Sequence, residues 1–278
     1  MHRRPPATNN AVPVQTAIVV LAALLVPVLV AAFIILYVLP HDVGGNIFAW
    51  PVNPRMSSMM LGATYMGGAY FFLIVFLSRK WRHARLGLLP VTSFAGTLGI
   101  ATLLHWQNFS HERLSFWIWA FLYFTVPIIL PILWYRNEKL ATRADVEREG
   151  YLSPAIRWAF GVLGAVMLIA SLLLFFLPQL MIATWPWTLT PLTSRIMAAM
   201  FILPAITALS MAYDGNWSSA HFLFHAQAIS IILMLIAAVI ARADINWAAP
   251  TAYLFIGSLM LILLLIAVAH TTRIHPRP

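Results

Sequence analysis

The chain has 278 residues, of which 62% are hydrophobic and only 9% are charged, and its formal net charge is +9. A soluble domain carries about 25% charged residues, so this composition excludes a water-soluble protein and predicts one that is solvated by a lipid bilayer. The sequence contains no cysteine, which excludes disulfides and thiolate metal sites. Lys and Arg in loops on one side of a membrane explain the positive charge, and we expect no nucleic-acid partner.

The polar, basic segment 1–10 precedes a first apolar run at residues 16–38. A signal peptide has an apolar core of about 7–15 residues, whereas a helix needs about 20 to cross a bilayer. We therefore interpret this run as an uncleaved first span. Similar runs follow at residues 56–78, 86–104, 115–135, 156–177, 193–213, 222–241 and 250–269. Because the runs are continuous rather than alternating, the predicted fold class is all-α, a polytopic transmembrane bundle with eight spans.

The basic residues predict an orientation. With the N-terminus inside, most of the 17 Lys and Arg residues fall in cytoplasmic segments, as the positive-inside rule requires. The tryptophans fall near the predicted span ends, where amphipathic rings anchor helices at the headgroup level. We expect an integral protein of the plasma membrane with both termini in the cytoplasm.

Two similar loops, WPVNPRMSS and WPWTLTPLTSR, each follow one apolar run and open the next. When Pro54 is aligned with Pro191, Asn53 falls opposite Thr190. Both pairs have the form of a side-chain N-cap followed by proline at the first helical position. The loops therefore predict an internal repeat.

The repeat sets the predicted domain organisation. Each repeat holds an even number of spans, so both insert in the same orientation and are related by an axis along the membrane normal. The predicted parts are a cytoplasmic basic tail (1–10), a first four-helix repeat (11–135), a charged cytoplasmic linker (136–151), a second four-helix repeat (152–270) and a second tail (271–278).

Histidine is the residue type that points most directly to chemistry. His221 and His225 are four residues apart and share a helix face, and His270 and Asp214 are expected on the same, inner side of the membrane. Three imidazoles and a carboxylate could ligate a metal ion, or two imidazoles could ligate a haem. The alternative is that these are interfacial polar side chains that extend to water, and on that interpretation no cofactor is expected.

A second polar group is expected on the outer side. Arginines and two helix N-termini would make a vestibule there attractive to anions. The alternative is a solvated rim without a partner. The residues of this group are His41, Asp42, Arg55, His105, His111, Glu112 and Arg195.

The predicted spans lack charged residues at their centres, which gives little support to proton-coupled or charge-selective transport. The sequence also lacks a phosphate-binding glycine loop, a serine nucleophile motif and paired carboxylates. These absences argue against an enzyme, and the histidines are the only residues that leave the question open.

Three functions stay open. We expect a non-catalytic membrane component, such as a subunit, scaffold or sensor that packs against other membrane subunits. The first alternative is a carrier or channel for a small neutral or amphipathic solute between the two repeats. The second is a metal or haem protein, redox or hydrolytic, that uses the inner histidines.

Overall fold

The computed structural model describes residues 13–141 and 150–272, and these residues form an all-helical membrane protein. Eight helices are long and apolar enough to cross a bilayer. They are α1 (Thr16–Phe33, extended by a π-helical turn, η1, Ile34–Val38), α3 (Arg55–Ser78), α4 (Trp81–Leu104), α5 (Leu114–Leu140), α6 (Pro154–Phe176), α8 (Pro191–Asp214), α9 (Trp217–Ile240) and α10 (Pro250–Thr271). Short helices connect them: α2 (His41–Ile47), α7 (Pro178–Thr184) and the 3-10 turns η2 (Trp106–Asn108) and η4 (Arg242–Asp244).

The long helices confirm the eight predicted spans, but α4 begins earlier and α5 ends later than predicted. Polar residues that pair with each other explain the extension. Arg85 Nε donates to Glu138 Oε1 over 2.9 Å, and Trp81 Nε1 donates to Glu138 Oε2 over 2.9 Å. The first residues of the predicted linker, 136–140, therefore belong to α5, and residues 142–149 lie outside the described residues.

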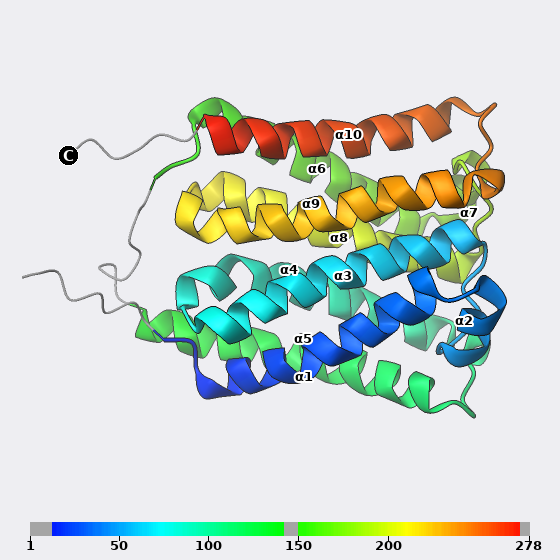
Figure 1. Ribbon diagram of the computed structural model, residues 1–278, viewed down its shortest axis with the longest axis horizontal. Helices are drawn as coiled ribbons and strands as arrows, with labels where there is room; N and C mark the ends of the chain where they lie inside the picture. Colours follow the sequence, from blue (N-terminus) through cyan, green and yellow to red (C-terminus); the bar gives the residue numbers. More distant parts are fainter. Residues whose placement is uncertain (1–12, 142–149, 273–278) are drawn as a thin grey trace, which may run out of the picture.

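The long helices lie side by side along the long axis of the molecule (Figure 1). We call the end at which α1 begins and α10 ends the termini end. The opposite end, which holds α2, α7, η2 and η4, is the loop end.

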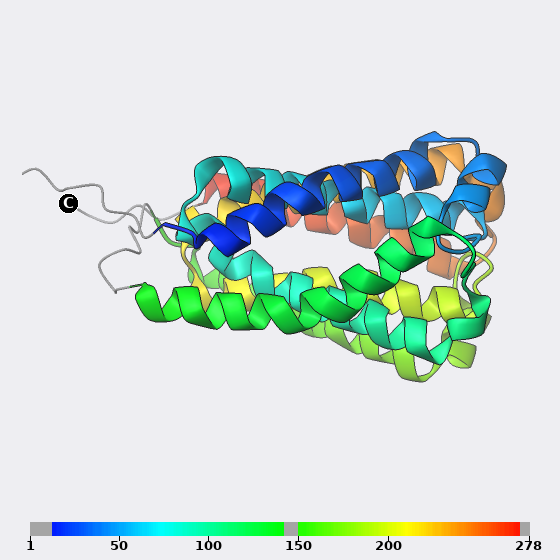
Figure 2. The same cartoon turned by 90° about the horizontal axis from the view of Figure 1, so that it is seen from below.

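Two views at right angles show two layers of helices (Figures 1 and 2). One layer holds α1, α3, α9 and α10 in that order, and the other holds α5, α4, α8 and α6. Each layer thus combines helices from before and after residues 142–149. The two parts of the chain meet mainly where α3 packs on α9 and α4 packs on α8.

Glycines allow the helix backbones to approach where α3 packs on α9 and where α4 packs on α5. A Cβ on Gly67 of α3 would lie 2.7 Å from the carbonyl oxygen of Ala226 on α9. A Cβ on Gly99 of α4 would lie 2.5 Å from the carbonyl oxygen of Tyr123 on α5. Close packing between small residues is the main source of helix association in lipid, so these positions fix the pairing of neighbouring helices.

The two repeated loops start their helices differently. Thr190 caps α8, because its Oγ1 accepts the N–H of Thr193 over 3.1 Å and Pro191 is the first helical residue. The corresponding role predicted for Asn53 is wrong, since α3 begins at Arg55 and Pro54 occupies the N-cap position.

Asn53 has another partner, and α3 has another cap. Asn53 Oδ1 lies 2.8 Å from His41 Nε2, while the N–H of Met56 donates to Asp244 Oδ2 over 2.8 Å. Asp244 belongs to η4, far along the chain, so a carboxylate from the second part of the protein stabilises the start of α3. A negative charge at this position also interacts favourably with the helix dipole.

Candidate functional site

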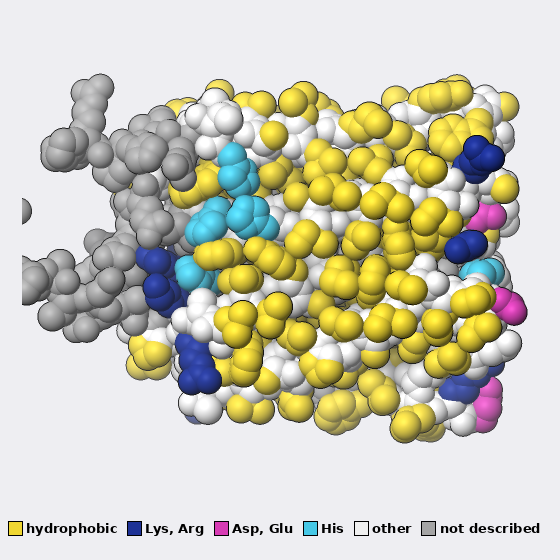
Figure 3. Space-filling model, viewed as in Figure 1, with side chains coloured by type: hydrophobic (Ala, Val, Ile, Leu, Met, Phe, Trp, Pro, Cys, Tyr) yellow, Lys and Arg dark blue, Asp and Glu magenta, His cyan; other side chains and the backbone are white. Residues whose placement is uncertain are grey.

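Four histidines gather near the termini end of the bundle, and we call them the histidine cluster: His83 on α4, His221 and His225 on α9, and His270 on α10. Neighbouring ring centroids are 6.2 Å apart for His83 and His221, 6.1 Å for His221 and His225, and 5.4 Å for His225 and His270. In the space-filling view, histidine side chains form a group near this end, close to Lys and Arg side chains (Figure 3). His221, His225 and His270 are therefore reachable from the surface of the bundle, whereas His83 is buried.

The closest approach within the cluster is between His225 and His270. Their Nε2 atoms are 3.4 Å apart, and the two rings are inclined by only 22°. Nδ1 of His270 lies 2.9 Å from the carbonyl oxygen of Ile266, to which it can only donate. In a neutral ring this leaves Nε2 with its lone pair directed at His225.

The other nitrogen of the His225 ring also has a polar contact. Nδ1 of His225 lies 3.3 Å from the hydroxyl oxygen of Tyr70 on α3. A tyrosine hydroxyl can donate or accept, so this contact is compatible with a lone pair or a proton on Nε2 of His225. Trp217 packs edge-on against His270, with ring centroids 4.8 Å apart, and restricts the orientation of that ring.

His221 and His83 continue the cluster away from this pair. His221 Nδ1 lies 3.2 Å from the carbonyl oxygen of Trp217, one turn earlier in α9. His83 is only 7% exposed, and Arg82 Nε donates to its Nε2 over 3.3 Å. Within the described residues its buried Nδ1 has no hydrogen-bond partner.

Asp214 does not join the predicted set of ligands. Its Oδ2 lies 2.5 Å from Arg85 Nη1, and Arg85 also pairs with Glu138. This network neutralises the carboxylate and joins α4, α5 and α8. Across the described ranges 13–141 and 150–272, no three His, Asp or Glu side chains are arranged to hold one metal ion. Of the four predicted residues, the structure brings His225 and His270 into contact, with His221 one turn away.

Sequence reasoning missed two residues of this region, His83 and Tyr70. His83 stands in the basic segment WRHAR, which the span prediction assigned to a loop. Tyr70 is an uncharged residue within the predicted span 56–78. Neither has a spacing in the sequence that relates it to His225, because each comes from a different helix.

The distance between the two Nε2 atoms determines how the pair can share an ion. Bonds of about 2.05 Å at the tetrahedral angle place two ligand nitrogens about 3.3 Å apart, whereas nitrogens on opposite sides of an ion are about 4.1 Å apart. The observed separation of 3.4 Å fits the first arrangement. The pair can thus provide two adjacent ligands of a tetrahedral ion, or share a proton.

At the loop end, the structure brings some of the predicted vestibule residues together. A cavity of about 280 Å³ lies between the two repeated loops, and its lining includes Asn53, Thr190 and His105. Arg195 Nη1 donates to His105 Nε2 over 2.7 Å. Burial, and then the Arg195 guanidinium, lower the pKa of His105, so this ring is neutral and accepts at neutral pH.

The other vestibule residues have separate surroundings, and they do not line this cavity. Glu112 lies 3.4 Å from Arg113, whose Nη1 donates to the carbonyl oxygens of Gly45 and Phe48. His111 packs against aromatic rings. Asp42 lies in the first turn of α2, and Arg55 is the first residue of α3.

A third feature is a small cavity of about 50 Å³ where α3, α4, α8 and α9 meet. One water needs about 10–15 Å³ of such space, so the cavity has room for a few waters. Glycines of α3 and α4 and the side chains of Thr64, Thr207, Gln227 and Ser230 line it.

Comparison with known proteins adds no relative: the chain matches no protein-family model, no curated protein and no solved structure. The function is therefore inferred from the chemistry of these three regions.

Proposed function

We propose that this chain is an integral membrane protein that binds one transition-metal ion between His225 and His270. The observation that supports this most directly is the 3.4 Å separation of the two Nε2 atoms. The backbone hydrogen bond from Nδ1 of His270 also supports it, because metal-binding histidines typically donate their other ring N–H to a carbonyl or carboxylate.

The ligand type restricts the metal. Neutral imidazole suits Zn, Cu, Fe and Ni, whereas Mg and Ca prefer oxygen ligands. The sequence contains no cysteine, and the nearby carboxylate of Asp214 is paired with Arg85. We therefore infer a transition-metal ion held by nitrogen, and zinc and copper are the ions with which we test it.

The same distance favours a single ion over a haem. Axial histidines lie on opposite sides of the haem iron, which requires a nitrogen separation of about 4 Å. His225 and His270 would supply two of the four ligands of a tetrahedral ion. His221, whose ring centroid lies 6.1 Å from that of His225, would have to change its rotamer to add a third. The remaining position would be open to water or an external ligand, as in sites that act on or transfer a ligand rather than in closed structural sites.

The test is metal content after purification. Protein in detergent is incubated with Zn²⁺ or Cu²⁺, separated from free ion by gel filtration, and measured by mass spectrometry of the metal. We expect about one ion per chain, and loss of that ion in His225→Ala and in His270→Ala. His41→Ala is the matched control, because His41 lies at the loop end and is not part of the proposed site.

Three outcomes contradict the proposal. Wild-type protein that binds no ion, or both alanine variants retaining the ion, would reject the histidine pair as the site. An absorption band of bound haem that disappears in His270→Ala would replace the ion with a haem.

We also propose that the two parts of the chain are tandem repeats with both termini in the cytoplasm. Both parts run in the order long helix, short helix, two long helices, 3-10 turn and long helix. Both also make the same backbone contact: Val14 N–H donates to Arg79 O, and Leu152 N–H donates to Gly215 O, each over 2.9 Å. Tags at Asn53 and Thr190 that become accessible from opposite sides of the plasma membrane would reject the repeat.

A second candidate function, a carrier or channel for a small neutral solute, is supported by the cavity between the four central helices. Gln227 lines it and makes no hydrogen bond to another described residue. An amide without a partner in hydrocarbon is costly, so we infer that water or a solute occupies this space. Proteoliposome swelling in glycerol tests this: we expect faster swelling with wild-type protein than with Gln227→Leu, and equal rates would reject it.

That the chain is a non-catalytic component bound to other membrane subunits stays a prediction. Its test is co-purification of a stable partner at a constant ratio.

A further inference from the structure

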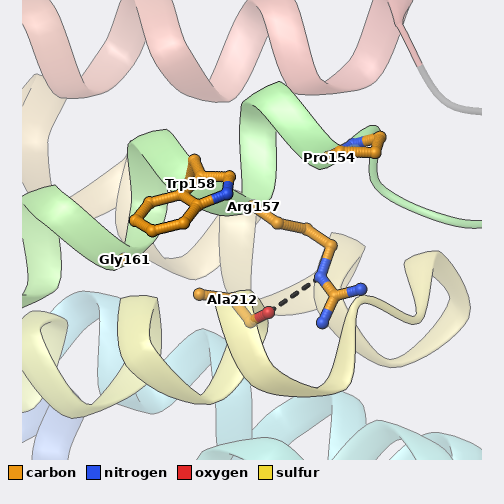
Figure 4. Close-up of a pocket in the computed structure, with 5 residues that line it drawn as sticks. All are labelled: Pro154, Arg157, Trp158, Gly161 and Ala212. Atoms are coloured by element: carbon orange, nitrogen blue, oxygen red, sulfur yellow. Dashed lines mark hydrogen bonds between the residues drawn. The ribbon is translucent and has the colours of Figure 1, made fainter.

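A groove opens on the outside of the bundle where α6 and α8 meet at the termini end. It has a volume of about 400 Å³ and is lined by Pro154, Arg157, Trp158, Gly161 and Ala212 (Figure 4). Figure 4 shows the Arg157 side chain extending from α6 across to α8, with the Trp158 ring on α6 beside the groove. The groove therefore has one cationic wall, one aromatic wall and a floor of small residues.

Arg157 has hydrogen-bonding capacity to spare. Its Nε donates to the carbonyl oxygen of Ala212 and its Nη2 to that of Tyr213, each over 2.8 Å. These are carbonyls of the last turn of α8, which lack partners within the helix. A guanidinium has five N–H groups, so three make no hydrogen bond to a described residue.

The charge of Arg157 is also uncompensated within the described residues. No carboxylate among them lies within ion-pair distance of it, in contrast to Arg85, which contacts both Glu138 and Asp214. A planar guanidinium binds phosphate with two parallel hydrogen bonds. Among the residues that the structure describes, the groove thus lacks a negative partner of the kind that phosphate provides.

The depth of the groove is that of lipid headgroups. Arg157 lies in the first turn of α6, and the aromatic side chains next to it, Trp158 and Tyr213, are 77% and 88% exposed. Exposed Trp and Tyr at span ends place amphipathic rings at the membrane–water interface. The phosphate layer of the adjacent leaflet therefore lies level with the free guanidinium N–H groups.

An apolar track leads from the groove toward the membrane centre. Val162, Val166 and Ile169 follow Trp158 on one face of α6, and all three are more than half exposed. A lipid whose phosphate contacts Arg157 would lay an acyl chain along this track. A free phosphate ion would gain nothing from it.

From this arrangement we propose that the groove between α6 and α8 is a binding site for the phosphate of an anionic phospholipid. The guanidinium of Arg157 binds the phosphate oxygens, Trp158 covers the glycerol region, and the exposed Val162, Val166 and Ile169 contact an acyl chain. This inference is independent of the metal site, because it uses none of the residues of the histidine cluster.

The floor of the groove offers a variant that keeps Arg157 in place. A Cβ on Gly161 would lie 3.7 Å from the Cβ of Ala212, an ordinary contact. Gly161→Leu therefore fills the groove without a backbone clash. The matched control is Gly257→Leu on α10, where a Cβ would have no heavy atom within 4 Å.

The experiment titrates delipidated protein in detergent with phosphatidylglycerol and measures bound lipid by native mass spectrometry. We expect affinity about tenfold lower in Arg157→Gln, because charge-assisted hydrogen bonds are lost, and a similar loss in Gly161→Leu. Gly257→Leu should bind as the wild type does. Thermal unfolding of each variant shows whether lost binding reflects lost folding, and Gly161→Leu keeps the test decisive if Arg157→Gln unfolds.

Two further titrations identify the ligand. Diacylglycerol, which has no phosphate, should bind much more weakly, and inorganic phosphate at millimolar concentration should not displace phosphatidylglycerol. Equal binding of diacylglycerol would overturn phosphate recognition, and displacement by inorganic phosphate would overturn the lipid as the ligand. Wild-type affinity in folded Gly161→Leu would overturn the groove as the site.

Discussion

α5 and α10 hold corresponding places in the element order, each after a long helix and a 3-10 turn, yet they pack very differently. α5 lies closely against α4: the Tyr123 carbonyl sits over Gly99, and Trp119 Nε1 donates to Thr102 Oγ1 over 2.9 Å. α10 packs much less closely on α9, and it runs along the edge of the bundle in Figure 1.

The two contacts differ in the groups that make them. Between α4 and α5 the backbones themselves approach, which is how helices associate strongly in lipid. Between α9 and α10 the imidazoles of His225 and His270 make a polar contact. The looser contact between α9 and α10 leaves room for these rings. It is at this contact that we propose the metal site.

The largest expected effect comes from placing the same side chain at a glycine in the α4–α5 contact and at an exposed glycine of α10. Gly99→Leu would push a side chain against the Tyr123 carbonyl, since even a Cβ would lie 2.5 Å from that oxygen. We expect a loss of about 3 kcal/mol of unfolding free energy. Gly257→Leu on α10 should change stability by less than about 0.5 kcal/mol, because its surroundings are open. Unfolding in detergent measures both, and equal losses would contradict the comparison.

A smaller effect is expected from removing one hydroxyl of a buried pair. α5 contributes to this pair, and α10 has no such pair among its described contacts. Tyr123 and Tyr65, both buried, are hydrogen-bonded over 2.9 Å. Tyr123→Phe leaves the Tyr65 hydroxyl without this partner and should cost about 1–3 kcal/mol. Ser258→Ala on α10 should cost little, because Ser258 bonds only to a carbonyl of its own helix. The same unfolding measurement applies, and an unchanged Tyr123→Phe would refute the assignment.

The turns that precede the two helices give a third comparison. Asp244, in the turn before α10, caps α3, so Asp244→Ala should cost about 1–2 kcal/mol. Asn53→Ala should cost clearly less, since Asn53 caps no helix. If Asn53→Ala were the more damaging change in thermal unfolding, the cap assignment would be reversed.

The smallest effect concerns pH at the loop end of α4. Burial, and then Arg195, lower the pKa of His105 from its ordinary value of 6.5. The unfolded chain therefore binds this proton more readily. The stabilising contribution is complete above pH 6.5 and is lost as the pH falls below it through the lowered folded-state pKa. His105→Gln should weaken the fall in melting temperature on acidification. An unchanged pH profile would show that His105 does not contribute.

Part of the candidate site could be predicted from the sequence. The spacing of His221 and His225 placed them on one helix face, and the span ends placed His270 at the same depth. The sequence could not predict that His225 and His270 meet, because this depends on which helix lies beside α9. It also assigned Asp214 to the wrong partner, since Arg85 reaches it from a helix 129 positions earlier.

The sequence by itself determined the number of spans, their limits to within about five residues and the cap at Thr190. These features depend on local hydropathy and on contacts within one turn. Only the tertiary structure decided that α3 pairs with α9, that α4 pairs with α8, and that Asp244 caps α3. In a bilayer every span is apolar on all sides, so hydropathy identifies the helices but does not distinguish their faces. Close approach at particular glycines and a few polar contacts decide which faces meet.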